Sequence, residues 1–421
     1  MPLSDKLDSS QQSAQPQLAT ALDAFSCADG MLCIGGKTPA QIAAMLDAEV
    51  FYAYDRQALR HKMQRLRNAL PAAVKLHYAV KANPYGPVVQ QMASLVDGMD
   101  VASRRELLLA LQSGMTASQI SFAGPGKTDT ELAAAIAAGC VVHLESANEM
   151  RRLQRLCLET NTTAQVALRI NPEFELKGAG MKMAGGAKAF GIDQSQVFAL
   201  LAEVQQGPLQ LVGFHLYCGS QNLHADAILQ SQRQSLQLLT QLRPMCPDLR
   251  FFNLGGGFGV PYFPADKPLD LDAVGAGMTA LLHEFAPSIA GLELVLELGR
   301  YLVADAGVYL SRVIDIKTSH GSTFVVTNGG LHHHLANSGN FGQVVRRNYP
   351  VVLANKLDQP VAGPLQVVGP LCTPLDVLAD KVLLPTPDIG DWFAVLQSGA
   401  YGASASPQAF LSHGAVAEIL L

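Results

Sequence analysis

The sequence predicts an α/β protein in which a (β/α)8 TIM barrel is combined with a β-rich second domain. Two observations predict the barrel: strands and helices alternate eight times over about 230 residues, and polar or charged residues follow most of the strands. The third observation is a change beyond Gly299, where short β-rich runs are separated by Gly, Pro and Asn turns. An open, doubly wound sheet is the alternative, because periodicity alone does not show that a sheet closes.

Length and composition fit a globular, intracellular protein. The chain has 421 residues, 49% hydrophobic and 15% charged, with a net charge of −5. That length allows two domains, and the absence of any basic cluster argues against a nucleic-acid partner. The seven cysteines show no C-x-x-C or other metal-ligand spacing, so we expect reduced thiols in the cytoplasm and no metal site.

The amino-terminal stretch is polar and rich in Ser and Gln, and we expect residues 1–17 to be a disordered tail. It lacks the basic and apolar regions of a signal peptide. Glu297, Arg300 and Asp305 interrupt the most apolar part of the chain, so no membrane-spanning segment is expected.

The barrel is expected to occupy residues 51–303. Its eight strands are predicted at 75–80, 98–101, 119–122, 141–144, 164–170, 211–216, 250–254 and 293–296. Helical segments between them include 103–112, 129–138, 147–158 and 225–242. An earlier strand is predicted at 51–54, followed by a helix that Asp55 caps. The β-rich domain contains strands at 307–316, 323–327, 366–368 and 392–397, and the Gly-Ala-rich loop 178–188 is expected to be flexible.

Chemistry in such barrels lies at the carboxyl ends of the strands. The first strand ends in Lys81, and a lysine buried there would have a lowered pKa and a nucleophilic amine. That amine suits a Schiff base with an aldehyde cofactor. The alternative is a lysine that simply reaches solvent.

Later strand ends carry groups that suit a phosphate. Gly255-Gly256-Gly257 has no side chains to block close approach, so its backbone N–H groups can face an anion. Gly219-Ser220 and Gly299-Arg300 add a hydroxyl, amides and a guanidinium. A triple glycine can also be only a flexible turn, but barrels commonly bind phosphate at these strands.

Glu297 ends the eighth strand, and two roles are open for it: a salt bridge with Arg300, or a partner for a pyridinium nitrogen. A carboxylate beside that nitrogen keeps the ring protonated and makes it a strong electron sink. Together with Lys81 and a phosphate cup, this glutamate describes a site for pyridoxal 5'-phosphate.

Five motifs follow one another along the chain: Tyr78-Ala79-Val80-Lys81-Ala82-Asn83, Gly255-Gly256-Gly257-Phe258, Glu297-Leu298-Gly299-Arg300-Tyr301, Gly369-Pro370-Leu371-Cys372 and Gly399-Ala400-Tyr401. In this order they resemble the signatures of the fold-type III pyridoxal-phosphate decarboxylases, the family of ornithine, arginine and diaminopimelate decarboxylases. The resemblance covers about residues 30–415.

The resemblance implies a role for each matching residue. Lys81 would form the Schiff base, Glu297 would pair with the pyridinium nitrogen, and the reaction would pass through a quinonoid intermediate. Cys372 resembles a cysteine that enters the site of the neighbouring subunit in a homodimer, and it is the candidate proton donor. Residues 18–50 would join residues 304–421 in the β-rich domain. The remaining residues expected to bind the cofactor are Asp100, Arg169 (near the phenolic oxygen), Tyr217, Ser220, Gly255, Gly256, Gly257, Gly299, Arg300 and Tyr401.

The sequence departs from the family pattern over the cofactor ring and at the substrate's distal end. Tyr217 stands where the family usually has a histidine, and His215, two residues earlier on the same strand face, has no assigned role. Thr373 stands where ornithine- and diaminopimelate-type enzymes have an acidic residue that meets the distal amine. Asp376 could still offer a carboxylate there.

The third departure is the run His332-His333-His334, close to where diaminopimelate enzymes carry an arginine for the distal carboxylate. Consecutive side chains diverge, so the three are not a metal triad. His333 and His334 either face the substrate or belong to a turn.

Segments 180–188, 333–338 and 370–374 resemble a narrower branch: the exosortase-associated pyridoxal decarboxylases and a decarboxylase that acts on a glutamyl group tethered to an acyl carrier protein. We therefore expect a decarboxylase of an L- or D-amino acid or of a carrier-tethered aminoacyl group. A diaminopimelate or ornithine decarboxylase proper is an alternative. An amino-acid racemase on the same fold is another, although racemases place arginine at the pyridine nitrogen. A non-catalytic cofactor carrier would lack the β-rich domain.

Overall fold

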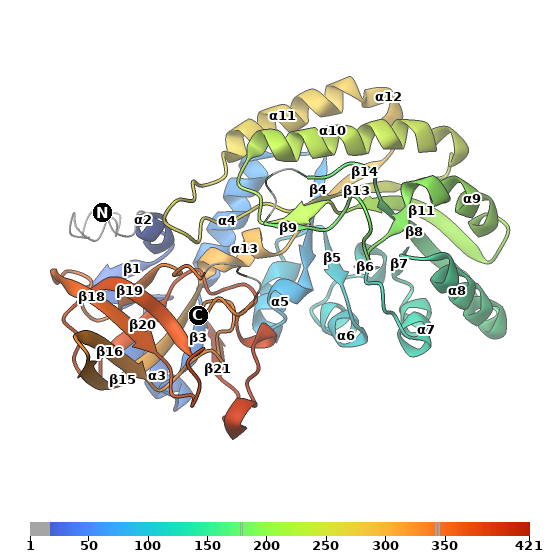
Figure 1. Cartoon of the computed structure of the whole chain (residues 1–421). Helices are drawn as coiled ribbons and strands as arrows, with labels where there is room; N and C mark the ends of the chain where they lie inside the picture. Colours follow the sequence, from blue (N-terminus) through green and yellow to red (C-terminus); the bar gives the residue numbers. More distant parts are fainter. Residues whose placement is uncertain (1–16, 177, 179, 342, 344–345) are drawn as a thin grey trace. The chain divides into compact units, whose positions relative to one another are not determined.

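The computed structural model describes residues 17–176, 178, 180–341, 343 and 346–421, which fold as two compact units (Figure 1). The barrel unit comprises Lys62–Val260 and Pro268–Tyr301. The β unit comprises the described part of Met1–His61, together with Pro261–Lys267 and Leu302–Leu421. The expected tail lies outside the described residues except for Gln17, which begins helix α2 (Gln17–Leu22).

Parallel strands close into a ring in the barrel unit, which confirms the TIM barrel and excludes the open sheet. The ring closes because β14 pairs with β4 at one junction and β7 pairs with β8 at another. Its strands, in order, are β4 (Val74–Ala79), β5 (Gly98–Val101), β6 (Ile120–Phe122), β7 (Val141–Leu144), β8 (Ala164–Asn171), β11 (Leu209–Leu216), β13 (Phe251–Gly256) and β14 (Glu293–Leu298).

Helices surround this ring, and α10 and α11 run side by side along it (Figure 1). Several begin at a side-chain cap in the segment that follows a strand. Ser103 and Ser146 accept backbone hydrogen bonds from the third residue of their helices, and Thr128 forms a capping box with Glu131. The helices of this unit include α5 (Gly86–Ala93), α6 (Arg104–Gln112), α7 (Asp129–Ala138), α8 (Ala147–Thr160), α9 (Gln194–Val204), α10 (Ala225–Leu242), α11 (Leu271–Glu284), α12 (Ala286–Ile289) and α13 (Arg300–Val303). α4 (Arg56–Ala69) starts in the β unit and continues into the barrel unit.

The β unit is built around the long strand β15 (Gly307–Ser319). The first part of β15 pairs with β3 (Phe51–Tyr54) and β20 (Trp392–Val395), and its last part pairs with β16 (Ser322–Thr327). Further pairings add β17 (Val351–Leu353), β18 (Val361–Val368), β19 (Val377–Pro385) and β21 (Ala417–Leu420). β19 and the short β17 and β21 were not anticipated from the sequence.

The barrel range expected from residue 51 therefore begins too early. All four residues of β3 are buried, and the strand has neighbours on both edges, β15 and β21, within the β unit. The amino-terminal segment also belongs there, because Leu18, Leu22 and Ile34 share a core with Val308 and Trp392. That segment contains β1 (Ser26–Ala28), β2 (Met31–Cys33) and α3 (Pro39–Leu46).

The loop predicted to be flexible contains regular structure. It contains β9 (Met181–Lys182), which pairs antiparallel with β12 (Gly219–Ser220), and it precedes β10 (Ile192–Asp193). Within the described residues, none of the helices has both the length and the hydropathy that crossing a bilayer requires.

Candidate functional site

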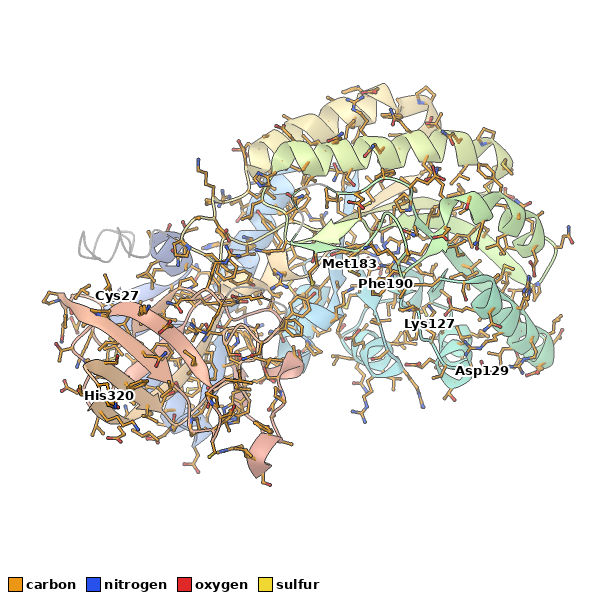
Figure 2. All side chains as sticks on the ribbon, viewed as in Figure 1. Cys27, Lys127, Asp129, Met183, Phe190 and His320 are labelled. Atoms are coloured by element: carbon orange, nitrogen blue, oxygen red, sulfur yellow. The ribbon has the colours of Figure 1, made fainter. Side chains whose placement is uncertain are left out.

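The carboxyl ends of the barrel strands surround a cavity of about 470 Å³. Four residues predicted from the sequence line it together, each from a different strand or strand end: Lys81, Asp100, Arg169 and Glu297. Loop residues complete the wall, among them Lys127 before α7, and Met183 and Phe190 between β8 and α9 (Figure 2). The strand-end prediction therefore brings these four side chains to one place.

Lys81 lies in a single 3-10 turn, Val80–Ala82, directly after β4. The turn is anchored by Tyr78, whose hydroxyl donates a 2.8 Å hydrogen bond to the carbonyl oxygen of Asn83. From there the Lys81 amine lies 3.6 Å from Oε1 of Glu297 and 5.7 Å from the centre of the Tyr217 ring. The side chain is 45% exposed, so the expectation that this lysine is buried is wrong for the chain as described; it extends into an open cavity.

Glu297 is 4% exposed and its two oxygens face nitrogen groups. Besides the Lys81 contact, Oε2 lies 3.2 Å from Nε2 of His215, although that N–H is not well aligned for a hydrogen bond. Burial would raise the pKa of Glu297, but the charge of Lys81 and the contact with His215 outweigh it and hold the pKa well below its usual range. The carboxylate is therefore ionised. His215, which the sequence left without a role, is its neighbour.

The glycine-rich turn after β13 has the geometry that close approach to a phosphate needs. Gly255 and Gly257 have φ angles of 68° and 79°, in the left-handed region. A Cβ at Gly256 would collide with the carbonyl oxygen of Glu297, and one at Gly257 with that of Gly219. Beside this turn, the Ser220 hydroxyl is buried and has no hydrogen-bond partner among the described residues. These features fit a phosphate held by backbone amides and a hydroxyl.

Gly299 brings the end of β14 against the lysine turn. A Cβ at Gly299 would lie 3.0 Å from the Cβ of Ala82, and Arg300 follows as the first residue of α13. Arg300 therefore lies at the same end of the barrel as the other groups that are predicted to bind the phosphate.

Arg169 is held by Glu145, a partner that the sequence reasoning did not assign. Its Nη1 lies 2.7 Å from Oε1 of Glu145, and its guanidinium covers the Phe190 ring at 5.1 Å. Glu145 also accepts hydrogen bonds from the backbone N–H groups of Gly124 and Gly191. Burial would raise the pKa of Glu145, but Arg169 holds it below its usual value. The position of Glu145 directly after the strand at 141–144 was the available signal.

A buried ion pair stabilises the part of the cavity wall that contains Lys127. The amine of Lys127 lies 2.9 Å from Oε1 of Glu149 and donates to the carbonyl oxygens of Gly124 and His143 at 2.7 and 2.9 Å. Glu149 in turn accepts a 2.8 Å hydrogen bond from the Glu145 backbone N–H. In the sequence, only its position in a glycine-rich loop distinguishes Lys127 from other lysines.

Asp100 lies inside the barrel between two side chains. Its Oδ2 is 3.5 Å from Nδ1 of His77, and Oδ1 accepts a hydrogen bond from the Ser121 hydroxyl. Burial would lower the pKa of His77, but the Asp100 carboxylate more than offsets this and raises it. Asp100 is thus a buried carboxylate at the cavity wall.

The other predicted site residues belong to the β unit. Cys372 is exposed, and Thr373 follows it. Tyr401 has a φ of 54°, and its ring lies 6.3 Å from that of Phe341. Asp376 is 3% exposed and accepts hydrogen bonds from the backbone N–H groups of Leu331 and Leu371 at 2.6 and 2.9 Å.

The histidine run lies inside the β unit. Nε2 of His334 pairs with the Ser398 hydroxyl at 2.9 Å, and Nδ1 accepts from the Asn337 N–H at 3.3 Å. Nε2 of His333 lies 3.2 Å from the carbonyl oxygen of Gly414. These partners favour a structural role, and a substrate contact stays a prediction. Across the part of the chain that is described, no group of three or more His, Cys, Asp or Glu side chains is arranged to hold a metal ion.

Comparison with known proteins identifies the family. Residues 56–304 match the family model "Pyridoxal-dependent decarboxylase, pyridoxal binding domain". The chain is 35% identical over 381 residues to an L-glutamyl-[BtrI acyl-carrier protein] decarboxylase of Niallia circulans, an alignment that covers 88% of each chain. It is 31% identical to a 2-[(L-alanin-3-ylcarbamoyl)methyl]-2-hydroxybutanedioate decarboxylase of Staphylococcus aureus, covering 89% of this chain and 94% of the relative.

Diaminopimelate decarboxylases are also similar. The enzyme of Campylobacter jejuni is 31% identical over 85% of this chain and 87% of its own. The crystal structure of the Helicobacter pylori enzyme complexed with L-lysine superposes with a TM-score of 0.81 at 25% identity, covering 91% of this chain and 94% of that chain.

Proposed function

This chain belongs to the pyridoxal-dependent decarboxylases, and we propose that its substrate is an amino-acid group whose distal end is joined to a carrier instead of ending in a free ammonium. The reaction class is that of the family: release of the α-carboxylate as carbon dioxide with pyridoxal phosphate. The observation that supports the catalytic assignment most strongly is the buried, ionised Glu297 facing Lys81 across one cavity.

The residues at the carboxyl ends of the barrel strands fit pyridoxal phosphate. Lys81 would hold the aldehyde carbon, and the Ser220 hydroxyl with the Gly255–Gly257 amides would bind the phosphate. When bound, the cofactor supplies an electron sink for the electrons that decarboxylation leaves behind. The Glu297 carboxylate would hold a proton on the ring nitrogen, which strengthens that sink. Arg169, whose Nη1 lies 2.7 Å from Oε1 of Glu145, would stay oriented toward the cavity.

The residue at the position that would meet the distal end of the substrate supports the proposed substrate. Thr373 has no charge, and its hydroxyl accepts a 3.3 Å hydrogen bond from the Leu375 backbone N–H. A substrate ammonium buried there without a carboxylate would cost roughly 3 kcal/mol or more. At about 1.4 kcal/mol per factor of ten, this corresponds to about two orders of magnitude. Two of the three relatives named above act, by their names, on a glutamyl group of a carrier protein and on a carbamoyl-linked amino acid, and the third is a diaminopimelate decarboxylase.

Asp376 is the residue whose carboxylate could pair with the distal ammonium of an ordinary diamine precursor and so allow that precursor as a substrate. Its two oxygens already accept hydrogen bonds from Leu331 and Leu371, and both bonds would break if it turned toward a substrate. This geometry supports the carrier-linked substrate over free ornithine or diaminopimelate.

We propose in addition a homodimer with shared sites, in which Cys372 enters the site of the neighbouring subunit and protonates Cα. Two facts support this assignment: Cys372 is exposed in the described chain, and the Asp376 carboxylate fixes the backbone of Leu371, directly before it.

Carbon dioxide release from a panel of substrates tests the substrate assignment. We expect the glutamyl thioester of an acyl carrier protein to be used, and kcat/KM for free ornithine, lysine and meso-diaminopimelate to be at least about 100-fold lower. Thr373→Asp should narrow this gap by raising activity on the free diamino acids, whereas the matched control Thr373→Ser should not. Efficient wild-type turnover of ornithine or diaminopimelate would overturn the proposed substrate.

A further inference from the structure

A row of buried side chains runs from Glu297 into the barrel interior. His215, on β11, is 1% exposed and lies beside Glu297, and His143, on β7, is fully buried beside His215. The two histidines meet through their Nδ1 atoms, 2.9 Å apart, with the ring planes inclined at 53°. Three strands therefore contribute one side chain each to a continuous contact chain.

The Nδ1–Nδ1 contact restricts where the protons lie. A hydrogen bond needs one donor and one acceptor, so only one of the two Nδ1 atoms can carry a hydrogen. If His143 is the donor, Nδ1 of His215 is the acceptor, and a neutral His215 must then carry its hydrogen on Nε2. That nitrogen is the one 3.2 Å from Oε2 of Glu297. In this arrangement His143 donates to His215, and the hydrogen of the His215 ring is on the nitrogen nearest to the carboxylate.

The surroundings of Nε2, on the other side of the His143 ring, favour a neutral His143. His143 lines a second cavity of about 160 Å³, together with residues at the amino ends of the strands such as Lys75, Asp97 and Glu293. Its Nε2 is buried and has no hydrogen-bond partner in the part of the chain that is described, which suits an acceptor nitrogen better than a second N–H. Burial, and then the neighbouring His215, hold the pKa of His143 well below its usual value.

We propose that His143 is a positioning residue for the active site: it donates a hydrogen bond to His215 and thereby keeps His215 in the tautomer whose Nε2–H faces Glu297. His143 touches neither the cavity that holds Lys81 nor any reacting atom in this scheme. Its effect passes through His215 to the orientation and the ionised state of the carboxylate. A partner that fixes a histidine tautomer is a recurring feature of well-ordered sites.

This inference rests on the proposed role of Glu297, but its first test needs no cofactor and no turnover. Nitrogen-15 NMR of the histidine rings in cofactor-free protein reports which ring nitrogens carry hydrogen. We expect Nε2 of His215 and Nδ1 of His143 to be protonated and Nδ1 of His215 to be a hydrogen-bonded acceptor. A His215 protonated on both nitrogens, with His143 as the acceptor, would overturn the proposal.

Two substitutions at one position form the second test. His143→Asn keeps an N–H donor close to the place of Nδ1, whereas His143→Leu keeps the bulk and removes the donor. We expect His143→Leu to lower kcat about tenfold with little change in KM, to shift the absorption band of the bound cofactor, and to let His215 populate both tautomers in NMR spectra. His143→Asn should restore kcat, the band and the tautomer.

The outcomes separate this inference from the function it rests on. Equal losses in two folded variants, His143→Asn and His143→Leu, would show that the donated hydrogen bond is not what matters, and the inference would fail. If His143→Leu does not fold, the ring spectra of the wild type and of His143→Asn decide the question. Wild-type spectra with the expected tautomers, alongside normal turnover by Glu297→Gln, would instead remove the role of Glu297 and leave the histidine pair standing.

Discussion

At the residue scale, Glu297 is a buried carboxylate whose neighbours are Lys81 and His215. Burial alone would favour its neutral form, and the two nitrogen groups reverse that preference. An ionised acceptor at this place can hold a proton on a pyridine nitrogen, whereas a neutral amide of the same shape cannot.

Glu297→Gln tests this role with a nearly isosteric change. We expect the cofactor to remain bound and kcat to fall by about two orders of magnitude or more, because the variant lacks the charge that keeps the ring protonated. KM should change much less. The control is Glu293→Gln, at the exposed start of the same strand, which should leave turnover unchanged. Normal turnover by Glu297→Gln would show that the Glu297 carboxylate has only a structural role.

The sequence could predict the site residues that lie at strand ends. It could not predict pairs of residues that only the folded barrel brings together. Lys81, Arg169 and Glu297 were found because the barrel collects strand ends, whatever else surrounds them. The partnership of His143 with His215 joins residues 72 positions apart in the chain, and only the closed barrel brings them into contact. No local pattern marks it.

At the element scale, hydrophobic periodicity located the barrel strands to within about two residues, because each one is a short apolar run between two helices. The same signal could not say which sheet a strand joins. β3 has the pattern of a buried strand, and its partners β15 and β21 lie more than 250 and more than 360 residues further along the chain.

The segment after β16 offers a prediction about pH. His334 is fully buried and its pKa is lowered to about 3, mainly by burial. The unfolded chain therefore binds more protons than the folded one as the pH falls below about 6.5. This contribution to stability is present above about pH 6.5 and is lost progressively as the pH falls toward 3, at up to about 1.4 kcal/mol per pH unit.

We expect His334→Gln to flatten the fall of Tm between about pH 6.5 and 4.5, even if the variant is less stable at neutral pH. His320→Gln is the matched control, because His320 is an exposed histidine of the same unit (Figure 2). Thermal unfolding at several pH values measures both. Parallel wild-type and His334→Gln curves would mean that this ring takes up no extra proton on unfolding.

At the scale of the whole molecule, the proposed active site needs residues from two subunits. Only the resemblance to the family, and no feature of composition or periodicity, pointed to this arrangement. The chain carries the parts in different units: Lys81 in the barrel unit, and Cys372, exposed, in the β unit.

Mixing two inactive variants tests the sharing. After subunit exchange between Lys81→Ala and Cys372→Ala, we expect part of the activity to return, because each heterodimer contains one site with both residues intact. Mixing Lys81→Ala with Glu297→Gln should restore nothing, since both residues belong to the same barrel. Confirmed exchange without recovery would place Cys372 outside the partner's site.

The most direct measurement is to reduce the purified protein with borohydride and to map the modified peptide by mass spectrometry. Reduction fixes the cofactor to the amine that holds it. We predict the adduct on the peptide that contains Lys81, and no adduct there in Lys81→Ala. Lys127 lines the same cavity and is the informative alternative. An adduct on Lys127, or a reduced cofactor that leaves the protein unmodified, would contradict the assignment of Lys81 as the residue around which this site is built.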